Sequence, residues 1–253
     1  MTTTTPRRDR PRIAVATVVN REHEALLGQV DGLAMSTWPP DVHVVLSVSD
    51  RELTRNRLPI RSDRWETRVP RLKLPGGTPG WEGDALLRAM DTAADSGAEV
   101  LVFMAVDSIP TPGLLQAYAE HARDVDGARP SVVEAEVVGL APPGPLGYPV
   151  SSELEGWAAT DDGADDDPCP VPASFALLAR HWGQLRDSWR RLAQDGATPV
   201  LPADAATAAA GSSSQLRGAT VYRQHPAATT ARYLHGRGDR LIDEGDGTQS
   251  VSA

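Results

Sequence analysis

The chain has 253 residues and a formal net charge of −9. That charge argues against a nucleic-acid surface, which needs clustered positive charge. A single cysteine, Cys169, excludes a disulfide framework and a zinc site built from several cysteines. No apolar run reaches the roughly 20 residues that span a bilayer, and no secretory signal is visible, so we expect a soluble cytoplasmic protein.

The patterned part of the chain covers residues 12–235, between polar tails at 1–11 and 236–253 that we expect to be disordered. Apolar strands alternate there with amphipathic helices. This alternation predicts a single α/β domain whose mostly parallel central sheet is flanked by helices. The predicted strands cover residues 12–19, 42–48, 68–74, 99–107, 131–138, 172–178 and 219–225. The predicted helices lie between residues 20 and 38 and over 82–96, 113–122, 181–193 and 202–210.

Residues 99–110 form the most informative stretch. A continuous apolar run there predicts a strand that is covered on both faces, and Pro110 and Pro112 prevent it from continuing. Asp107 stands at its end. Because ligands of open α/β sheets bind at the carboxyl ends of the strands, Asp107 is a site candidate, although an aspartate also suits a turn before a proline.

Polar residues also follow the first two predicted strands. Asn20 can cap the first helix, and Arg21 and His23 can either reach a phosphate or remain on the surface. Asp50 ends the second strand, where it is a second site candidate or an ordinary helix start.

Trp81 follows the glycine-rich residues 75–80 and can stack on a base or a sugar, or simply pack. The loop is not a P-loop, because it lacks the Lys-Ser/Thr that would follow.

These residues, in this order, resemble the family-two glycosyltransferases of the GT-A fold, and in particular their bacterial galactosyltransferase-related branch. The central strand ends Met-Ala-Val-Asp-Ser-Ile-Pro at residues 104–110, where the family usually has Leu-Asp-Val-Asp-Cys-Ile-Pro. Residues 174–177 with Trp182 resemble the acceptor-side strand and helix, and residues 222–225 resemble a terminal Tyr-x-Gln-His segment. The resemblance spans roughly residues 12–235.

The resemblance implies transfer of a sugar from a nucleotide-sugar donor to a hydroxyl of a small molecule or glycan. It also implies a divalent ion, Mn²⁺ or Mg²⁺, that acts as Lewis acid on the diphosphate. Asp107 and His225 would be metal ligands, and Asp204 would deprotonate the acceptor. The residues expected on the nucleotide side are Asn20, Arg21, Asp50, Trp81 and Asp107.

Three positions depart from the family pattern. Ala105 stands where the first acid of Asp-x-Asp is usual, Gly80-Trp81 replaces Arg-Asn, and Ala203 replaces the glutamate that usually precedes Asp204. The metal site would then be reduced, either weak or completed by the diphosphate, His225 and water.

Two functions therefore stay open from the sequence. One is an active glycosyltransferase. The other is a catalytically silent GT-A-like protein that binds a nucleotide sugar or a partner without turnover. A nucleotidylyltransferase on a similar sheet is less well supported, because residues 19–21 lack the basic, glycine-rich signature that it would need near the first strand.

Overall fold

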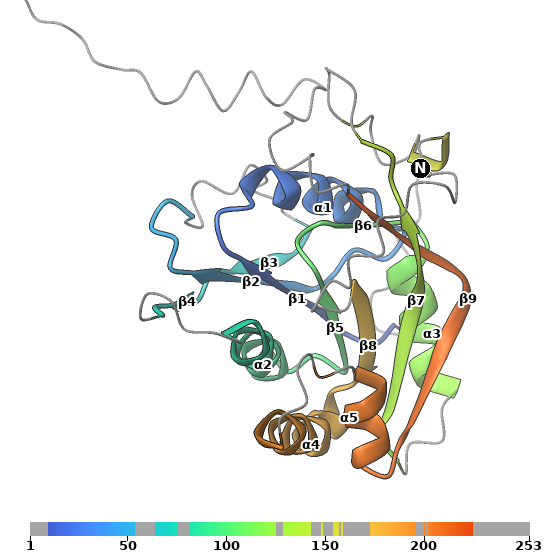
Figure 1. Ribbon diagram of the computed structural model, residues 1–253. Helices are drawn as coiled ribbons and strands as arrows, with labels where there is room; N and C mark the ends of the chain where they lie inside the picture. Colours follow the sequence, from blue (N-terminus) through green and yellow to red (C-terminus); the bar gives the residue numbers. More distant parts are fainter. Residues whose placement is uncertain are drawn as a thin grey trace, which may run out of the picture.

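The computed structural model describes residues 10–53, 64–74, 81–124, 129–142, 148, 154–156, 158, 173–195, 200 and 202–224. These residues form a mixed α/β fold in which a curled, nine-stranded sheet is flanked by helices (Figure 1). The fold class predicted from the sequence is confirmed. The predicted domain boundary at residue 235 and both predicted tails fall wholly or mostly outside the described residues and stay predictions.

The elements follow the predicted order closely. The strands are β1 (Ile13–Val19), β2 (Val42–Val48), β3 (Glu66–Arg68), β4 (Arg71–Leu72), β5 (Val100–Met104), β6 (Ser108–Pro110), β7 (Ser131–Gly139), β8 (Ser174–Leu178) and β9 (Ser212–Arg223). The α-helices are α1 (His23–Met35), α2 (Trp81–Ala94), α3 (Leu114–Asp124), α4 (Trp182–Gln194) and α5 (Pro202–Ala208).

The sheet has the strand order β3-β2-β1-β5-β8-β7-β9-β6, with β4 also paired to β2. The strands β2, β1 and β5 run parallel, whereas β8 is antiparallel to both β5 and β7. The chain steps from β1 to β2 on one side and then returns through α2 to β5 on the other side of β1. The carboxyl ends of β1 and β5 therefore form a topological switch point, which is where open α/β sheets bind their ligands.

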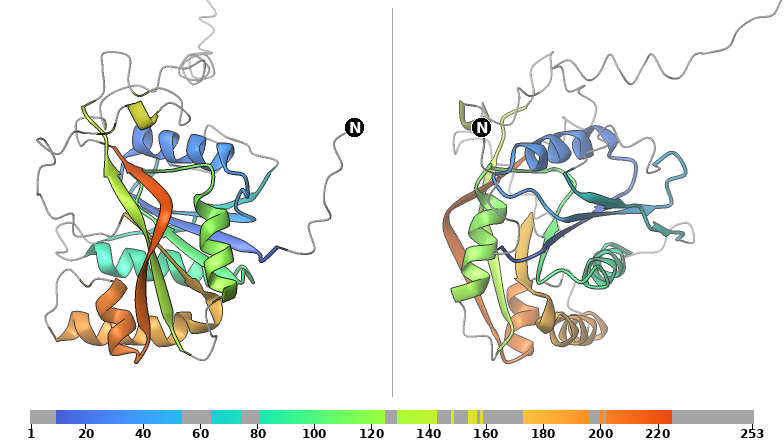
Figure 2. Two further views of the ribbon diagram at one scale, coloured as in Figure 1. Left: turned by 90° about the vertical axis from the view of Figure 1, so that its right-hand side faces the viewer. Right: turned by 180° about the vertical axis from the view of Figure 1, so that it is seen from behind.

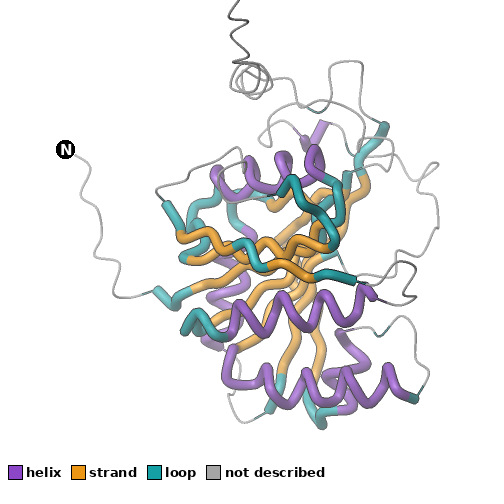
Figure 3. Tube along the Cα trace, turned by 90° about the vertical axis from the view of Figure 1, so that its left-hand side faces the viewer, coloured by secondary structure: helices purple, strands orange, loops and turns teal. Residues whose placement is uncertain are grey.

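Helices cover both faces of the sheet (Figure 3). Alternate residues of β1 explain this arrangement: Ala14 and Ala16 belong to the cluster under α2, α4 and α5, whereas Ile13 and Val15 belong to the cluster under α1 and α3. Because successive side chains of a strand point to opposite faces, a strand buried on both sides must be apolar throughout.

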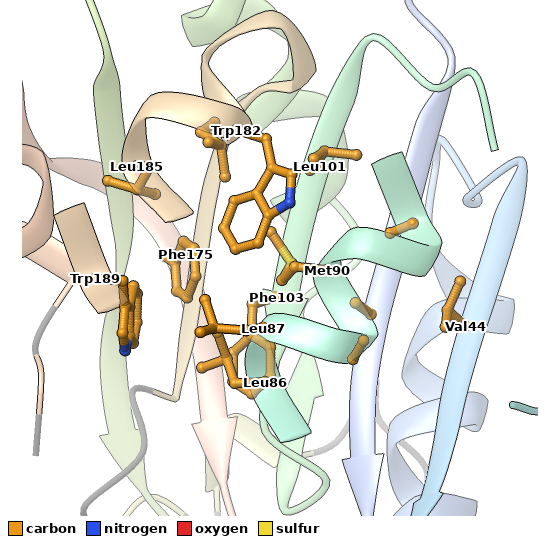
Figure 4. Close-up of a cluster of buried hydrophobic side chains, with 14 of the residues drawn as sticks. Val44, Leu86, Leu87, Met90, Leu101, Phe103, Phe175, Trp182, Leu185 and Trp189 are labelled. Carbon is orange, nitrogen blue, oxygen red and sulfur yellow. The ribbon is translucent and has the colours of Figure 1, made fainter. Parts of the chain in front are cut away.

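Aromatic side chains fill the cluster between the sheet and helices α2 and α4 (Figure 4). Phe103 and Phe175 from neighbouring strands stack with ring centroids 5.5 Å apart, and Trp189 of α4 stacks on Phe175 at 6.0 Å. Trp182 and Leu185 complete the buried stripe of α4, as its helical spacing predicts.

Two strands differ from the sequence prediction. The strand β5 ends at Met104, before the predicted end at residue 107, and the chain then forms β6, which the prolines had argued against. Pro110 is tolerated because β6 stands at the end of the strand order and, within the described part of the chain, pairs with β9 alone. The strand β9 begins at Ser212, whereas the sequence predicted a start near residue 219. The prediction missed the first half of β9 because these residues are polar and exposed and carry no apolar signal. Figure 2 shows β9 twisted around its parallel neighbour β7.

Two smaller predictions also need correction. In place of the strand predicted over 68–74 the chain has two short strands, β3, which ends at Arg68, and β4, which lies within that range, and both pair with β2. Asn20 does not cap the first helix: the capping position is Glu22, because the chain makes a tight turn between β1 and α1. Gly97, beyond the end of α2, has a φ of 74°, a left-handed conformation that glycine adopts readily and that commonly ends helices.

Helix α1 crosses β6 at unusually close range. A Cβ on Gly32 would lie 2.7 Å from Pro110 Cδ and 2.9 Å from Ile109 Cγ2. Contacts shorter than 3.0 Å force the backbones apart, so only glycine permits this approach.

Gly32→Ala is therefore expected to lower the free energy of unfolding by about 1–3 kcal/mol, the usual cost of overpacking a core. Gly183→Ala in α4 is the matched control, because nothing lies within 4 Å of its Cβ position. The control should leave stability unchanged or raise it by up to about 1 kcal/mol, the helix propensity of alanine over glycine. Urea denaturation measures both, and equal stability of Gly32→Ala and the wild type would contradict the close packing.

Candidate functional site at the carboxyl edge of the sheet

Three acids gather where β1, β2 and β5 end. Glu22 follows β1, Asp50 follows β2, and Asp107 follows β5. Arg21 and Ser49, directly before two of these acids, have left-handed backbones with φ of 72° and 50°. Such conformations cost non-glycine residues roughly 1–3 kcal/mol and concentrate at functional sites, where they make the sharp turns that present side chains.

Asp50 is buried and well satisfied. Its Oδ2 lies 2.5 Å from His23 Nε2, and its Oδ1 accepts hydrogen bonds from the backbone N–H groups of Glu52 at 2.8 Å and Leu53 at 3.3 Å. Burial alone would raise the pKa of Asp50, but these hydrogen bonds outweigh it and lower the pKa below its ordinary value. The carboxylate is therefore ionised at neutral pH and holds the His23 ring at the edge of the sheet.

Glu22 occupies the N-cap position of α1, next to His23. Its Oε2 accepts a 2.5 Å hydrogen bond from the backbone N–H of Asn20. Burial raises the pKa of Glu22, and the negative charge of Asp107 raises it further, against the lowering effect of backbone hydrogen bonds. Consecutive residues at the start of α1 thus face the acids that end β5 and β2.

Asp107 sits in a turn whose backbone is firmly held. The Ala105 N–H donates to Ala173 O at 2.9 Å, the Ser108 N–H donates to Ala105 O at 3.0 Å, and the Gln224 N–H donates to Asp107 O at 2.8 Å. Arg223 Nε donates to Asp107 Oδ2 at 3.1 Å. The other carboxylate oxygen, Oδ1, is buried and has no hydrogen-bond partner among the described residues.

A series of hydrogen bonds between buried polar side chains holds this turn in place. Gln29 of α1 donates through Nε2 to Ala105 O at 2.6 Å, and its Oε1 accepts a 2.7 Å hydrogen bond from Thr17 Oγ1. His43 Nε2 of β2 lies 3.4 Å from the same hydroxyl. All three side chains are almost fully buried, so each depends on the others for its hydrogen bonds.

The buried His43 gives the fold a defined pH dependence. Burial lowers its pKa from 6.5 to about 4. The unfolded chain takes up the proton near pH 6.5, whereas the folded protein takes it up only near pH 4. The contribution of His43 is therefore complete above pH 6.5 and falls by about 3 kcal/mol as the pH drops towards 4.

His43→Gln should remove this dependence. Between pH 7 and pH 4 the unfolding free energy of the wild type should fall by about 3 kcal/mol more than that of the variant, because glutamine does not titrate. Urea denaturation at a series of pH values measures the difference. Parallel curves for the two proteins would show that His43 is not buried as a neutral side chain.

Whether the carboxyl edge of the sheet suits a divalent ion depends on the ligand atoms that its side chains offer. The described residues contain no group of three His, Cys, Asp or Glu side chains placed to hold a metal. Asp107 Oδ1 nevertheless offers one buried carboxylate oxygen without a partner. Mg²⁺ commonly takes one or two carboxylates and completes its shell with substrate phosphates and water. The residues therefore fit a one-carboxylate site that depends on a phosphate ligand.

The structure brings together most of the predicted nucleotide-side residues. Asn20 and Arg21 follow β1, with Arg21 exposed, while Asp50 and Asp107 end the strands on either side. Trp81 is the first residue of α2, is partly buried, and packs against the cluster under that helix, which is the simple packing role left open above.

Asp204 lies in the first turn of α5 and is exposed. Burial raises the pKa of Glu134 of β7, and the negative charge of Asp204 raises it further. Among the described residues no hydrogen bond or ion pair joins Asp204 to Asp107. His225, the second predicted metal ligand, lies outside the described residues.

Sequence reasoning missed Glu22, Gln29, Arg223 and Gln224. Each depends on a contact between distant segments, of which the 3.0 Å hydrogen bond from Gln224 Nε2 to Ala25 O is the longest in sequence. Glu22 carried a local signal, because it lies two residues after Asn20 at a strand end, and Gln224 carried one as part of the Tyr-x-Gln-His resemblance at residues 222–225.

No protein-family model matches the sequence, and no curated protein matches it. Among solved structures the chain is similar to residues 1–349 of S. aureus TarS, with a TM-score of 0.52 and 13% identity over 86% of this chain and 61% of that chain. The same protein in complex with UDP-GlcNAc gives a TM-score of 0.50 and 14% identity over 87% and 61%. The chain thus spans about three fifths of those structures. The likeness shows a shared GT-A-like fold.

None of the helices in the described part of the chain is both long enough and apolar enough to cross a membrane.

Proposed function

We propose that this protein is a nucleotide-sugar-dependent glycosyltransferase that moves a sugar onto a hydroxyl of a small molecule or glycan. The observation that carries the proposal is Asp107, whose buried Oδ1 lacks a partner among the described residues at the switch point between β1 and β5. The GT-A-like fold supports it, as does the structure of the similar TarS with UDP-GlcNAc. The sequence of residues 104–110 favours the galactosyltransferase-related branch.

The nucleoside would lie over the ends of β1 and β2. Asp50 is presented there with His23, and a carboxylate oxygen can accept from a ribose or base donor in addition to its present hydrogen bonds. Asn20 and Arg21 border the same end of the sheet, and Trp81 lies at the start of α2.

The diphosphate would lie over the end of β5. A divalent ion held by Asp107 Oδ1 would supply Lewis-acid stabilisation to the leaving diphosphate when bound. Gln29 and Gln224 keep the turn that carries Asp107 in place through its backbone. Proper placement of the donor's leaving group then depends on groups that are already ordered in the fold.

Asp204 is the proposed base for the acceptor. In an inverting reaction the acceptor oxygen attacks the anomeric carbon, its proton passes to the Asp204 carboxylate, and the bond to the diphosphate oxygen breaks. Asp204 is itself exposed in the first turn of α5, which leaves its carboxylate accessible to an acceptor from solvent.

Donor binding is tested by thermal unfolding with UDP or GDP, each with and without Mn²⁺. We expect a rise in Tm with one nucleotide and Mn²⁺, because a ligand that binds only the folded state stabilises it. Asp107→Ala should abolish the Mn²⁺-dependent part of the rise.

Asp95→Ala is the matched control for this experiment, because Asp95 is an exposed acid beyond α2, away from the carboxyl edge. It should leave the response to nucleotide and Mn²⁺ unchanged. No shift of the wild type with any nucleoside diphosphate, in either condition, would overturn donor binding.

Turnover is tested separately by donor hydrolysis and by transfer to a hydroxyl acceptor. Asp204→Asn is expected to lower kcat by about 10²–10⁴-fold, the usual contribution of a general base, while nucleotide binding stays unchanged. Binding without any hydrolysis or transfer by the wild type would instead identify a silent nucleotide-sugar-binding protein.

A further inference from the structure

We propose that Arg223 binds the donor diphosphate directly, so that the nucleotide binds even without a divalent ion. This inference rests on the proposed function and adds the chemical group that holds the charged part of the donor. It concerns a permanent cation of the protein at the carboxyl edge rather than a bound ion.

The backbone of Arg223 is fixed on both sides. It is paired with Ser108 of β6 and with Gly139 of β7, and its carbonyl accepts a 2.9 Å hydrogen bond from the Leu140 N–H. The next residue, Gln224, is bonded to the Asp107 carbonyl. The guanidinium group therefore projects from a rigid strand end, which positions a binding group better than a loop does.

An anionic ligand at the carboxyl edge needs a positively charged group nearby, because the edge is acidic. Glu22, Asp50 and Asp107 are all acidic, and a nucleoside diphosphate carries further negative charge, so the ligand would be repelled without compensation. Arg223 Nε lies 3.1 Å from Asp107 Oδ2, on the same carboxylate as the buried Oδ1, which has no hydrogen-bond partner among the described residues. The guanidinium thus lies where the diphosphate would meet Asp107.

The same pair weakens the site for a metal. A positive guanidinium on one oxygen of Asp107 opposes a second cation on the other, until a diphosphate adds its own negative charge. The side chains of Arg223 and Asp107 are each 27% exposed, so the pair is partly shielded from water yet accessible from solvent. Arginine suits the task because its planar fork can bind phosphate oxygens in a bidentate manner.

Isothermal titration with UDP, on the full chain, in EDTA and in Mn²⁺, tests the proposal. The wild type should bind in both conditions. Arg223→Gln is expected to lose about 10-fold or more in affinity in EDTA, the usual worth of a hydrogen bond to a charged group, and less in Mn²⁺. Arg223→Lys should recover part of the loss, because it restores the charge without the fork.

Two further variants sharpen the result. Arg217→Gln is the matched control, an exposed arginine of the same strand, and should bind like the wild type. Asp107→Asn should keep binding in EDTA, because Arg223 remains, and should lose the gain from Mn²⁺. If Arg223→Gln does not fold, as judged by circular dichroism, Asp107→Asn and Arg223→Lys decide the question.

The proposal is overturned if the wild type binds UDP only with Mn²⁺, or if Arg223→Gln or Arg223→Lys binds as tightly as the wild type in EDTA. It is also overturned if Asp107→Asn loses binding in EDTA. Absence of UDP and GDP binding in both conditions has a different meaning, because it would remove the proposed function itself.

Discussion

The hydrogen bond from the buried Gln29 amide to the Ala105 carbonyl holds the point on which the candidate site depends. The strand β5 must end there, and the chain must turn so that Asp107 reaches the edge of the sheet. The Ala105 carbonyl already accepts the Ser108 N–H within the turn, and a second donor ties the turn to the rest of the fold. Gln29 supplies it at 2.6 Å from α1, and Thr17 and His43 keep the amide in place.

Because α1 supplies that donor, the packing of α1 and the placement of the acid are linked. The helix approaches β6 so closely that its Gly32 has no room for a Cβ. Its first turn carries Glu22 and His23, which face the acids that end β5 and β2. A single helix therefore sets the backbone of the turn and the charges around it. The edge is preorganised by the fold, which is what binding a charged ligand requires.

The sequence predicted the scaffold well because burial leaves a simple trace. Strands covered on both faces must be apolar throughout, and helices with one buried face repeat their apolar residues at helical spacing. These patterns located β1, β2 and β5, the helix of Trp182 and Trp189, and Asp107 at a strand end. They did not reveal β6, whose proline is tolerated because the strand pairs on one side only among the described residues. They also did not reveal the polar half of β9, which carries no apolar signal.

The partners of the candidate acids were beyond local patterns. The pair of Asp107 and Arg223 joins residues 116 positions apart, and the hydrogen bond from Gln224 to Ala25 joins residues 199 apart. Such contacts follow from the register between β6 and β9, which the sequence does not specify. The sequence nevertheless showed an acid at a strand end. It did not show which group balances the charge of that acid.

The central claim is that the edge formed by β1, β2 and β5 receives a nucleotide whose diphosphate meets Asp107 and Arg223. A crystal structure of the protein with UDP and Mn²⁺ tests it most directly. The account predicts phosphate oxygens within hydrogen-bonding distance of the Arg223 guanidinium, with the ion on Asp107 Oδ1. UDP bound elsewhere, or bound at this edge with its phosphates away from both side chains, would contradict the account.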